Sequence, residues 1–287
     1  MIEPGFLDEI ERLRPALDRE ASAVRQGEQR SPRVGEGLTF ADYRRYSPGN
    51  DIRLIDWKLY ARTDEYYIKQ FEEERSLTVH LLLDASASMD YGTGSARKFE
   101  YAAKIGLGFA ALTGAAHNDF VFGRFGDRVE RLDAGRSNRG EVLALIDRLN
   151  GMDPAGSADV EAAMAAYADR IRSRSLVVLL GDYLANPDAI EAGVAALTRT
   201  GADVLVVRVI APEEREPAVV GDTLFADPES ETTRRSYFSG ALARQYRTRL
   251  EAHVDEISDL VTRVGADHET VDTGEDFFES FASVWLG

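Results

Sequence analysis

The chain has 287 residues, 44% of them hydrophobic, which is enough to bury a substantial core in one large domain or two small ones. Fifty acidic against 34 basic residues give a net charge of −16, which argues against non-specific binding to nucleic acid. Cysteine is absent, which excludes disulfides, thiolate metal sites and cysteine nucleophiles. No apolar stretch approaches the roughly 20 residues of a membrane-spanning helix, and the acidic start lacks the features of a secretory signal, so we expect a cytoplasmic protein without a transmembrane segment.

Residues 1–75 are expected to form an N-terminal segment of a helix, a loop and a small β element. Apolar side chains recur every three or four residues over 5–26, which predicts an amphipathic helix, with Pro15 starting a second helical piece. We expect this helix to dock on the main domain; an arm that binds a partner is the alternative. Residues 40–62 interleave aromatic and balanced charged side chains, so we expect Arg53, Asp56 and Arg62 to form structural ion pairs rather than nucleic-acid contacts. A strand is expected over 65–71.

An apolar run at 77–83 ends in three oxygen-bearing side chains at alternate positions, Asp84, Ser86 and Ser88. The run has the length and composition of a strand that is covered on both faces of a parallel sheet. Ligands bind beyond the carboxyl ends of such strands. A carboxylate and two hydroxyls are hard ligands that suit Mg²⁺ or Mn²⁺. The run at 175–182 repeats the pattern and ends in Asp182, which predicts the second half of the same site.

Two motifs resemble known families. The sequence D-x-S-x-S at 84–88, followed by Met89, resembles the metal-ion-dependent adhesion site (MIDAS) of von Willebrand factor A (vWA) domains. That site is completed by a Thr and an Asp on later loops. Upstream, F-A-D-Y-R-R-Y-S-P-G-N-D-I-R-L-I-D-W-K-L-Y-A-R at 40–62 and Y-I-K-Q-F-E-E-E-R at 67–75 resemble the signature of the DUF58 family. The resemblance implies that Asp182 is the later Asp and that Ser157, from the loop before the next helix, replaces the Thr.

Strands and helices alternate over the remaining residues. Helices are expected at 97–113, 139–149, 159–172, 187–200, 239–264 and 275–285, and strands at 175–181, 203–210 and 266–271. Residues 120–125 and 128–132 predict a hairpin, so one edge strand should be antiparallel. Residues 212–231 read as a Pro- and acid-rich excursion. The order predicts an α/β fold over 76–287, a doubly wound, mostly parallel sheet of the vWA-like, Rossmann-type class.

Other interpretations of the same residues are weaker or stay open. Ser86 and Ser88 are also suited to cap a helix while Asp84 accepts backbone N–H groups. An EF-hand is excluded because its sixth and twelfth loop positions would be Met89 and Ser95. Ser86, Asp182 and His268 follow the chain order of an α/β-hydrolase triad, but no G-x-S-x-G elbow surrounds the serine. Residues 92–98 do not have the spacing of a phosphate-binding P-loop.

The resemblance implies a function that the residues alone do not give. In the families named, the bound metal keeps an open position that a carboxylate from a partner protein fills. DUF58 proteins are typically encoded near MoxR-type AAA+ ATPases. We therefore expect a non-enzymatic, Mg²⁺-dependent interaction module, an adaptor or co-chaperone of such an ATPase, with no catalytic residues. A hydrolase or a metal-dependent phosphoryl-transfer enzyme that uses Asp84 and Ser86 is the alternative.

Overall fold

The computed structural model describes residues 1–27, 40–46, 57–63, 65–71, 77–171, 174–217, 221–230 and 232–287. Two compact units result, one formed by Met1–Ser31 with Leu77–Gly287 and the other by Pro32–Ser76. The division differs from the predicted boundary at residue 75, because the N-terminal helix belongs to the large unit. The apolar face of that helix is covered by helices of the large unit, as shown below.

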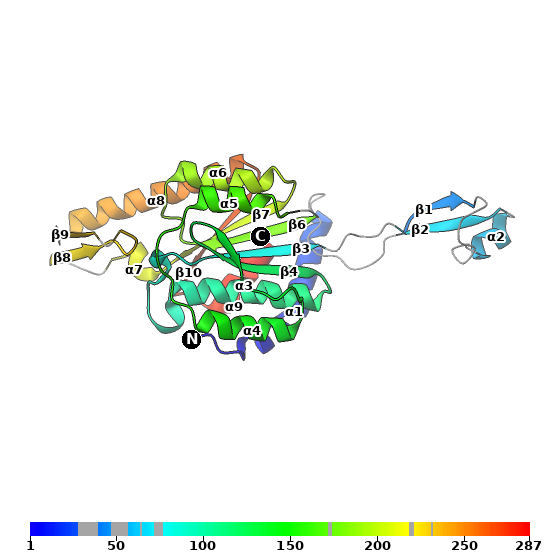
Figure 1. Ribbon diagram of the computed structural model, residues 1–287, viewed down its shortest axis with the longest axis horizontal. Helices are drawn as coiled ribbons and strands as arrows, with labels where there is room; N and C mark the ends of the chain where they lie inside the picture. The colour runs from blue at the N-terminus through cyan, green and yellow to red at the C-terminus, as the bar shows by residue number, and fades with distance from the viewer. Residues whose placement is uncertain are drawn as a thin grey trace. The chain divides into compact units, whose positions relative to one another are not determined.

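A six-stranded sheet forms the centre of the large unit (Figure 1). Its strand order is β10-β7-β6-β3-β4-β5. The members are β3 (Thr78–Asp84), β4 (Asp119–Phe125), β5 (Val129–Arg131), β6 (Ser175–Gly181), β7 (Asp203–Ile210) and β10 (Asp267–Asp272). All neighbours pair in parallel except β4 and β5. The predicted α/β sheet with one antiparallel edge strand is therefore confirmed.

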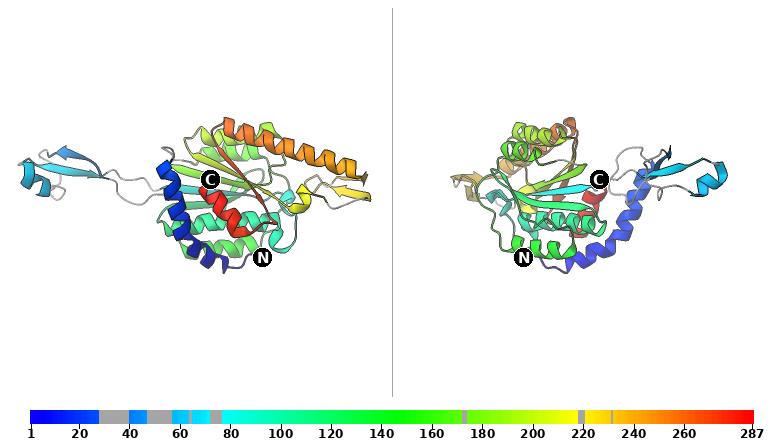
Figure 2. Two further views of the ribbon diagram at one scale, coloured as in Figure 1. Left: turned by 180° about the vertical axis from the view of Figure 1, so that it is seen from behind. Right: turned by 45° about the vertical axis from the view of Figure 1, so that its right-hand side comes forward.

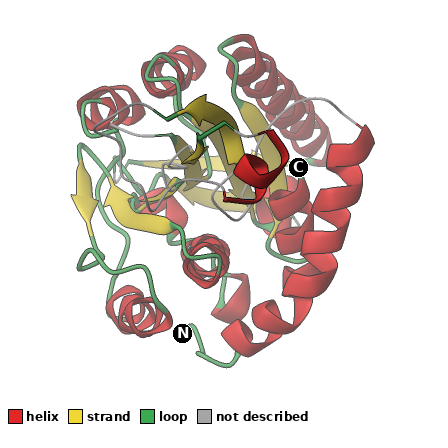
Figure 3. Ribbon diagram, turned by 90° about the vertical axis from the view of Figure 1, so that its right-hand side faces the viewer, coloured by secondary structure: helices red, strands yellow, loops and turns green. Residues whose placement is uncertain are grey.

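Helices cover both faces of this sheet (Figures 1 and 3). One layer consists of α5 (Val160–Ala168), α6 (Pro187–Thr198) and α8 (Gly240–Arg263), and the other of α3 (Lys98–Ala115), α4 (Arg139–Asn150) and α9 (Phe277–Leu286). Side-chain oxygens accept N–H groups of the first turn of α4, α5, α6, α8 and α9, from Asn138, Asp159, Asn186, Ser239 and Asp276. These caps explain why each of the five helices begins where it does.

Helix α3 lies close to the sheet because glycine removes a side chain at the contact. A Cβ at Gly106 would lie 2.9 Å from Cε2 of Phe122 and 3.0 Å from Cδ1 of Leu180, closer than van der Waals contact allows. Glycine costs about 1 kcal/mol relative to alanine in a helix, so the close approach is the compensation. This holds the start of α3 near the carboxyl ends of β3 and β6.

Helix α1 (Phe6–Gly27) packs against α3 and α9, which confirms the predicted docking (Figure 2). The ring of Phe6 meets the ring of Phe277 edge-on at a centroid distance of 6.0 Å, and Nζ of Lys104 lies 4.0 Å from the Phe277 centroid. The expected break at Pro15 was wrong, since one helix runs through it. A proline inside a helix removes one backbone hydrogen bond, and the packing of the first half offsets that loss.

The small unit contains an antiparallel pair, β1 (Phe40–Arg45) and β2 (Tyr67–Phe71), and the helix α2 (Trp57–Thr63). Strand β2 confirms the strand expected over 65–71. Arg53 and Asp56 lie outside the described residues, and Arg62 is exposed at the end of α2. The structural ion pairs expected of these three residues therefore stay a prediction.

The segment at 212–231, which is rich in proline and acidic residues, contains regular secondary structure. It contains α7 (Pro212–Arg215) and β8 (Gly221–Ala226), and β8 pairs in antiparallel with β9 (Thr233–Phe238). Most of the strand residues are exposed, so they lack the apolar alternation that identifies a half-buried strand. The described part of the chain contains no helix that is both long and apolar enough to cross a membrane.

We predict that His80 makes the fold sensitive to acid. His80 is buried in β3, with Nδ1 2.8 Å from the Tyr167 hydroxyl, and burial together with the charge of Arg131 lowers its pKa from 6.5 to about 4. Between pH 6.5 and about 4 the unfolded chain binds more protons at this histidine than the folded chain does. The contribution of His80 to the free energy of unfolding is therefore highest above pH 6.5 and decreases as the pH falls towards 4.

The test compares free energies of unfolding of wild type and His80→Gln across this pH range. Wild type should lose up to roughly 3 kcal/mol more than the variant as the pH falls from 6.5 to 4. His117→Gln, at an exposed position, is the control and should follow wild type. Parallel pH profiles for wild type and His80→Gln would contradict the assignment.

Candidate metal-binding site

The two predicted halves of the site lie side by side at the carboxyl edge of the sheet. Strands β3 and β6 are parallel neighbours, with Leu83 opposite Leu180. Asp84 and Asp182 therefore follow adjacent strand ends, and both are about 95% buried. A Cβ on Gly181 would lie 3.2 Å from Oδ2 of Asp84, so a side chain at this position would crowd the carboxylate.

The loop after β3 presents Asp84, Ser86 and Ser88 towards one another. The Ser86 N–H donates to Oδ1 of Asp84 at 2.8 Å, and the hydroxyls of Ser86 and Ser88 lie 3.0 Å apart. The short 3₁₀ helix that follows, Ala87–Met89, receives no side-chain cap from Ser86, and the N-cap of α3 is Arg97. The serines therefore do not make the hydrogen bonds expected of helix caps. Asp84 does accept a backbone N–H group, as that alternative expected.

The Asp84 carboxylate is in an environment that disfavours its charge. Burial, and then the nearby carboxylate of Asp182, raise the pKa of Asp84 to about 7, although hydrogen bonds from Ser86 act in the opposite direction. A buried carboxylate whose charge is further disfavoured by a second carboxylate is an arrangement that a cation would relieve.

Lys98 is the residue of this site that sequence reasoning missed. Its side chain is fully buried at the start of α3, and Nζ lies 2.8 Å from Oδ2 of Asp182 and 2.6 Å from Oε1 of Glu214 on α7. Arg208 on β7 is also buried, and its Nε donates to the Asp182 carbonyl at 3.3 Å. The chain has only four lysines, and this one lies between the motif and an apolar helix, which is the only signal that the sequence offered.

The turn after β6 is strained and is held from two sides. Tyr183 has φ = 51°, a left-handed conformation that is rare for a bulky residue. His253 on α8 lies with Nε2 3.0 Å from the Tyr183 carbonyl, while Arg208 holds the preceding carbonyl. The Tyr183 side chain is buried beside Gly181, and within the described residues its hydroxyl has no hydrogen-bond partner. Burial, Asp84 and Asp182 place its pKa well above the usual value.

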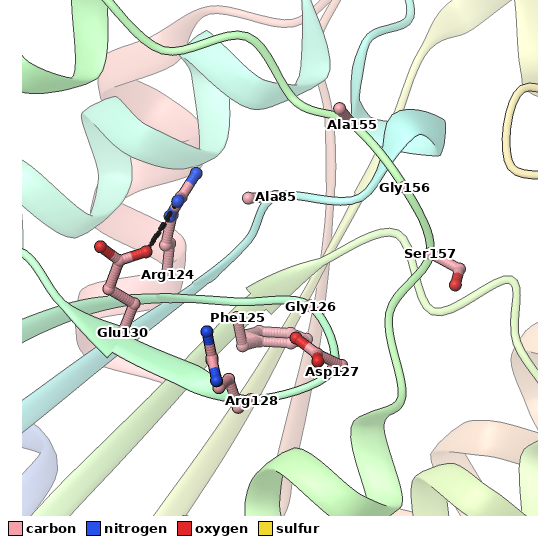
Figure 4. Close-up of a pocket in the computed structure, with 10 residues that line it drawn as sticks. All are labelled: Ala85, Arg124, Phe125, Gly126, Asp127, Arg128, Glu130, Ala155, Gly156 and Ser157. Atoms are coloured by element: carbon pink, nitrogen blue, oxygen red, sulfur yellow. Dashed lines mark hydrogen bonds and ion pairs between the residues drawn. The ribbon is translucent and has the colours of Figure 1, made fainter.

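Ser157 lies on the loop that joins α4 to α5, next to the motif. The Ala87 N–H donates to the Gly156 carbonyl at 2.9 Å, and the Ala155 N–H donates to the Ala85 carbonyl at 2.9 Å, so two backbone bonds fix this loop beside the loop after β3. The exposed Ser157 lines a pocket of about 410 Å³, across from Arg124 and its partner Glu130 (Figure 4). Ser157 as a metal ligand stays a prediction.

The donors at this edge fit a hard divalent cation. They are the oxygens of Asp84, Asp182, Ser86 and Ser88, with Ser157 on the adjoining loop. When all three carboxylates are ionised, Asp84, Asp182 and Glu214 exceed the positive charges of Lys98 and Arg208 by one. Nowhere in the described residues, this edge included, are three or more His, Asp or Glu side chains grouped to hold a metal, so a cation here would depend on two carboxylates and on hydroxyl oxygens.

A hydrolase triad does not assemble around Ser86. His268 lies on β10, three strands from β3 and level with Leu82 rather than with the strand ends. His80 contacts Tyr167 and Ser175. Within the described residues no histidine hydrogen-bonds to Ser86, so the triad lacks its histidine base.

Comparisons with known proteins identify a family and relatives of the chain. The model of the family described as "Protein of unknown function DUF58" matches residues 42–256. Uncharacterized proteins of Mycobacterium tuberculosis and Mycobacterium bovis are 25% identical over 278 residues, which cover 96% of this chain and 87% of each relative.

Two solved structures from Bacteroides are similar to the chain. An aerotolerance-related membrane protein from Bacteroides fragilis is 14% identical with a TM-score of 0.47, over 72% of this chain and 96% of that one. The conserved hypothetical protein BatB from Bacteroides thetaiotaomicron is 14% identical with a TM-score of 0.46, over 73% and 96%.

Lys98→Met should destabilise the fold strongly, because the substitution leaves the buried Asp182 and the partly buried Glu214 without their shared cation. We expect the free energy of unfolding to fall by about 3–5 kcal/mol, as measured by chemical denaturation. The double variant Lys98→Met/Glu214→Gln should recover part of the loss, because one unpaired carboxylate is then neutral. A single variant as stable as wild type would contradict the structural role of this network.

Tyr183→Phe and Tyr167→Phe make a matched pair with opposite expected effects. The Tyr183 hydroxyl is buried without a partner, so its removal should leave stability unchanged or raise it by up to about 1 kcal/mol. The Tyr167 hydroxyl is bonded to His80, so its removal should cost about 1–3 kcal/mol. Equal losses in thermal or chemical denaturation would show that the Tyr183 hydroxyl does have a partner.

Proposed function

We propose that this chain, which belongs to the DUF58 family, is a non-enzymatic protein-interaction module whose contact depends on a divalent cation, Mg²⁺ or Mn²⁺. The observation that carries the proposal is the pair of buried carboxylates, Asp84 and Asp182, that meet beside two hydroxyls with too little positive charge around them. When bound, the cation would offer a coordination position to a carboxylate of the partner protein.

The chain's own residues prepare this position. Asp84 and Asp182 would hold the cation with Ser86 and Ser88, and Ser157 is the candidate for a further ligand. Lys98 donates to the carboxylate of Asp182, and Arg208 donates to its backbone carbonyl. These two bonds hold the Asp182 side chain in one orientation. The Ser86 N–H does the same for Asp84. A rigid set of oxygens favours the small Mg²⁺ ion, which demands near-ideal geometry.

The partner class comes from the family resemblance. We infer that the partner is a MoxR-type AAA+ ATPase and that the chain acts as its adaptor or co-chaperone. A metal-dependent hydrolase or phosphoryl-transfer enzyme is the competing class. The non-enzymatic class is favoured because, within the described residues, no histidine hydrogen-bonds to Ser86 to complete a hydrolase triad.

We predict that Asp84→Ala removes partner binding and leaves the fold intact. The variant loses a charged ligand of the cation, and its stability without metal should be unchanged or higher because the repulsion with Asp182 is gone. Calorimetric titration with Mg²⁺, and then with a MoxR-type ATPase from the same organism in Mg²⁺ and in chelator, measures both effects; thermal melts monitor the fold.

Asp90→Ala is the matched control, because Asp90 lies on the same loop but is exposed and pairs with Arg97. It should bind Mg²⁺ and the partner as wild type does. Partner binding by wild type that is equally tight in chelator would refute a cation-dependent contact. If Asp84→Ala unfolds, the prediction that this carboxylate can be removed without loss of the fold is wrong.

A further inference from the structure

The β8–β9 hairpin exposes apolar side chains on one of its faces. Residues directly opposite each other in an antiparallel pair share a face, and Leu224 lies opposite Arg235 while Asp222 lies opposite Tyr237. On this face Leu224 is 65% exposed and Tyr237 is 66% exposed. On the other face the ring of Phe225, itself 39% exposed, lies 5.6 Å from the ring of the buried Phe238. The outward face therefore has an apolar surface without a described neighbour.

The chain that begins with β9 is basic, whereas residues 221–231, which contain β8 and the turn, carry four acidic side chains and no basic one. Residues 232–250, which form β9 and the first half of α8, contain five arginines and no acidic residue, whereas the whole chain has a net charge of −16. Arg235 pairs with Asp222, and Arg247 lies 3.7 Å from Glu216. Within the described residues, Arg234, Arg244 and Arg249 form no ion pair, and all three are exposed. Arg234 lies opposite Phe225 and so belongs to the other face of the hairpin. We call Leu224, Tyr237, Arg244 and Arg249 the hairpin surface.

The hairpin also presents strand edges. Strands β8 and β9 form a sheet of two strands that is separate from the six-stranded sheet, and the hairpin extends past the carboxyl edge of that sheet together with the start of α8 (Figures 1 and 2). A strand at a sheet edge has unpaired N–H and C=O groups that can pair with an added strand. An isolated pair of strands is also marginally stable and gains from a third.

We propose that the hairpin surface binds an extended acidic segment of a partner protein, which adds a third strand to β8–β9 while its carboxylates pair with Arg244 and Arg249. Strand addition takes affinity from main-chain hydrogen bonds and specificity from alternate side chains, here apolar ones towards Leu224 and Tyr237. A protein segment is favoured over nucleic acid, because nucleotides cannot complete the strand ladder and the rest of the chain repels phosphates. This contact needs no metal.

The probe is a fluorescent peptide of alternating glutamate and valine, roughly ten residues long, the upper end of usual strand length. Binding to the full chain is followed by anisotropy at low salt in chelator, so that carboxylate binding at a metal site does not contribute. The acidic peptide should bind, its affinity should fall as salt rises, and the matching lysine–valine peptide should not bind. Hydrogen exchange should slow at amides of β8 or β9.

Arg244→Glu/Arg249→Glu should weaken peptide binding by roughly tenfold or more, because the reversed charges now repel the acidic segment. The control Arg136→Glu/Arg199→Glu changes two exposed arginines outside the hairpin surface and should bind as wild type does. The proposal is overturned if the acidic peptide does not bind, if the lysine peptide binds equally, if both double variants behave alike, or if oligothymidylate binds more tightly than the peptide.

Discussion

The ion pairs of Lys98 with Asp182 and Glu214 are the interaction on which the carboxyl edge of this fold depends. Burying carboxylates is costly unless positive charge lies within hydrogen-bond distance. Lys98 supplies that charge from the start of α3, and Gly106 allows α3 to lie close enough to the sheet to deliver it. The same ammonium joins β6 to α7, so one side chain connects the candidate metal loops with the segment that leads into the hairpin.

Negative charges at this edge outnumber the positive ones, and this excess is what favours the binding of a cation. Lys98 and Arg208 hold Asp182, whereas Asp84 has hydrogen bonds from Ser86 but no cationic partner within the described residues. Asp84 is therefore the position at which an additional cation would gain most. The strained conformation of Tyr183, kept by His253 and by burial, is the kind of local cost that folds retain where a functional turn requires it.

The proposed contacts lie on the same side of the large unit and differ in their physical basis. A cation-dependent contact would be lost in chelator, while strand addition at β8–β9 would be weakened by salt. A partner that used both would combine two weak attachments into one stronger one, provided that its segments reach both positions. The basic hairpin surface and the carboxylate-accepting site would both select for acidic partners.

The sequence by itself determined the sheet, the strand ends and the family. Short apolar runs that end in Asp84 and Asp182 have few structural solutions, and parallel strands bring their carboxyl ends to one edge, so those two residues were predictable. Only the tertiary structure decided which charges lie behind them, because Lys98, Arg208 and Glu214 are far apart in the chain and meet through packing. The tertiary structure also decided two elements that the local composition opposed. The helix continues through Pro15 because α3 and α9 pack against it, and the hairpin at 221–238 forms because its two strands pair with each other.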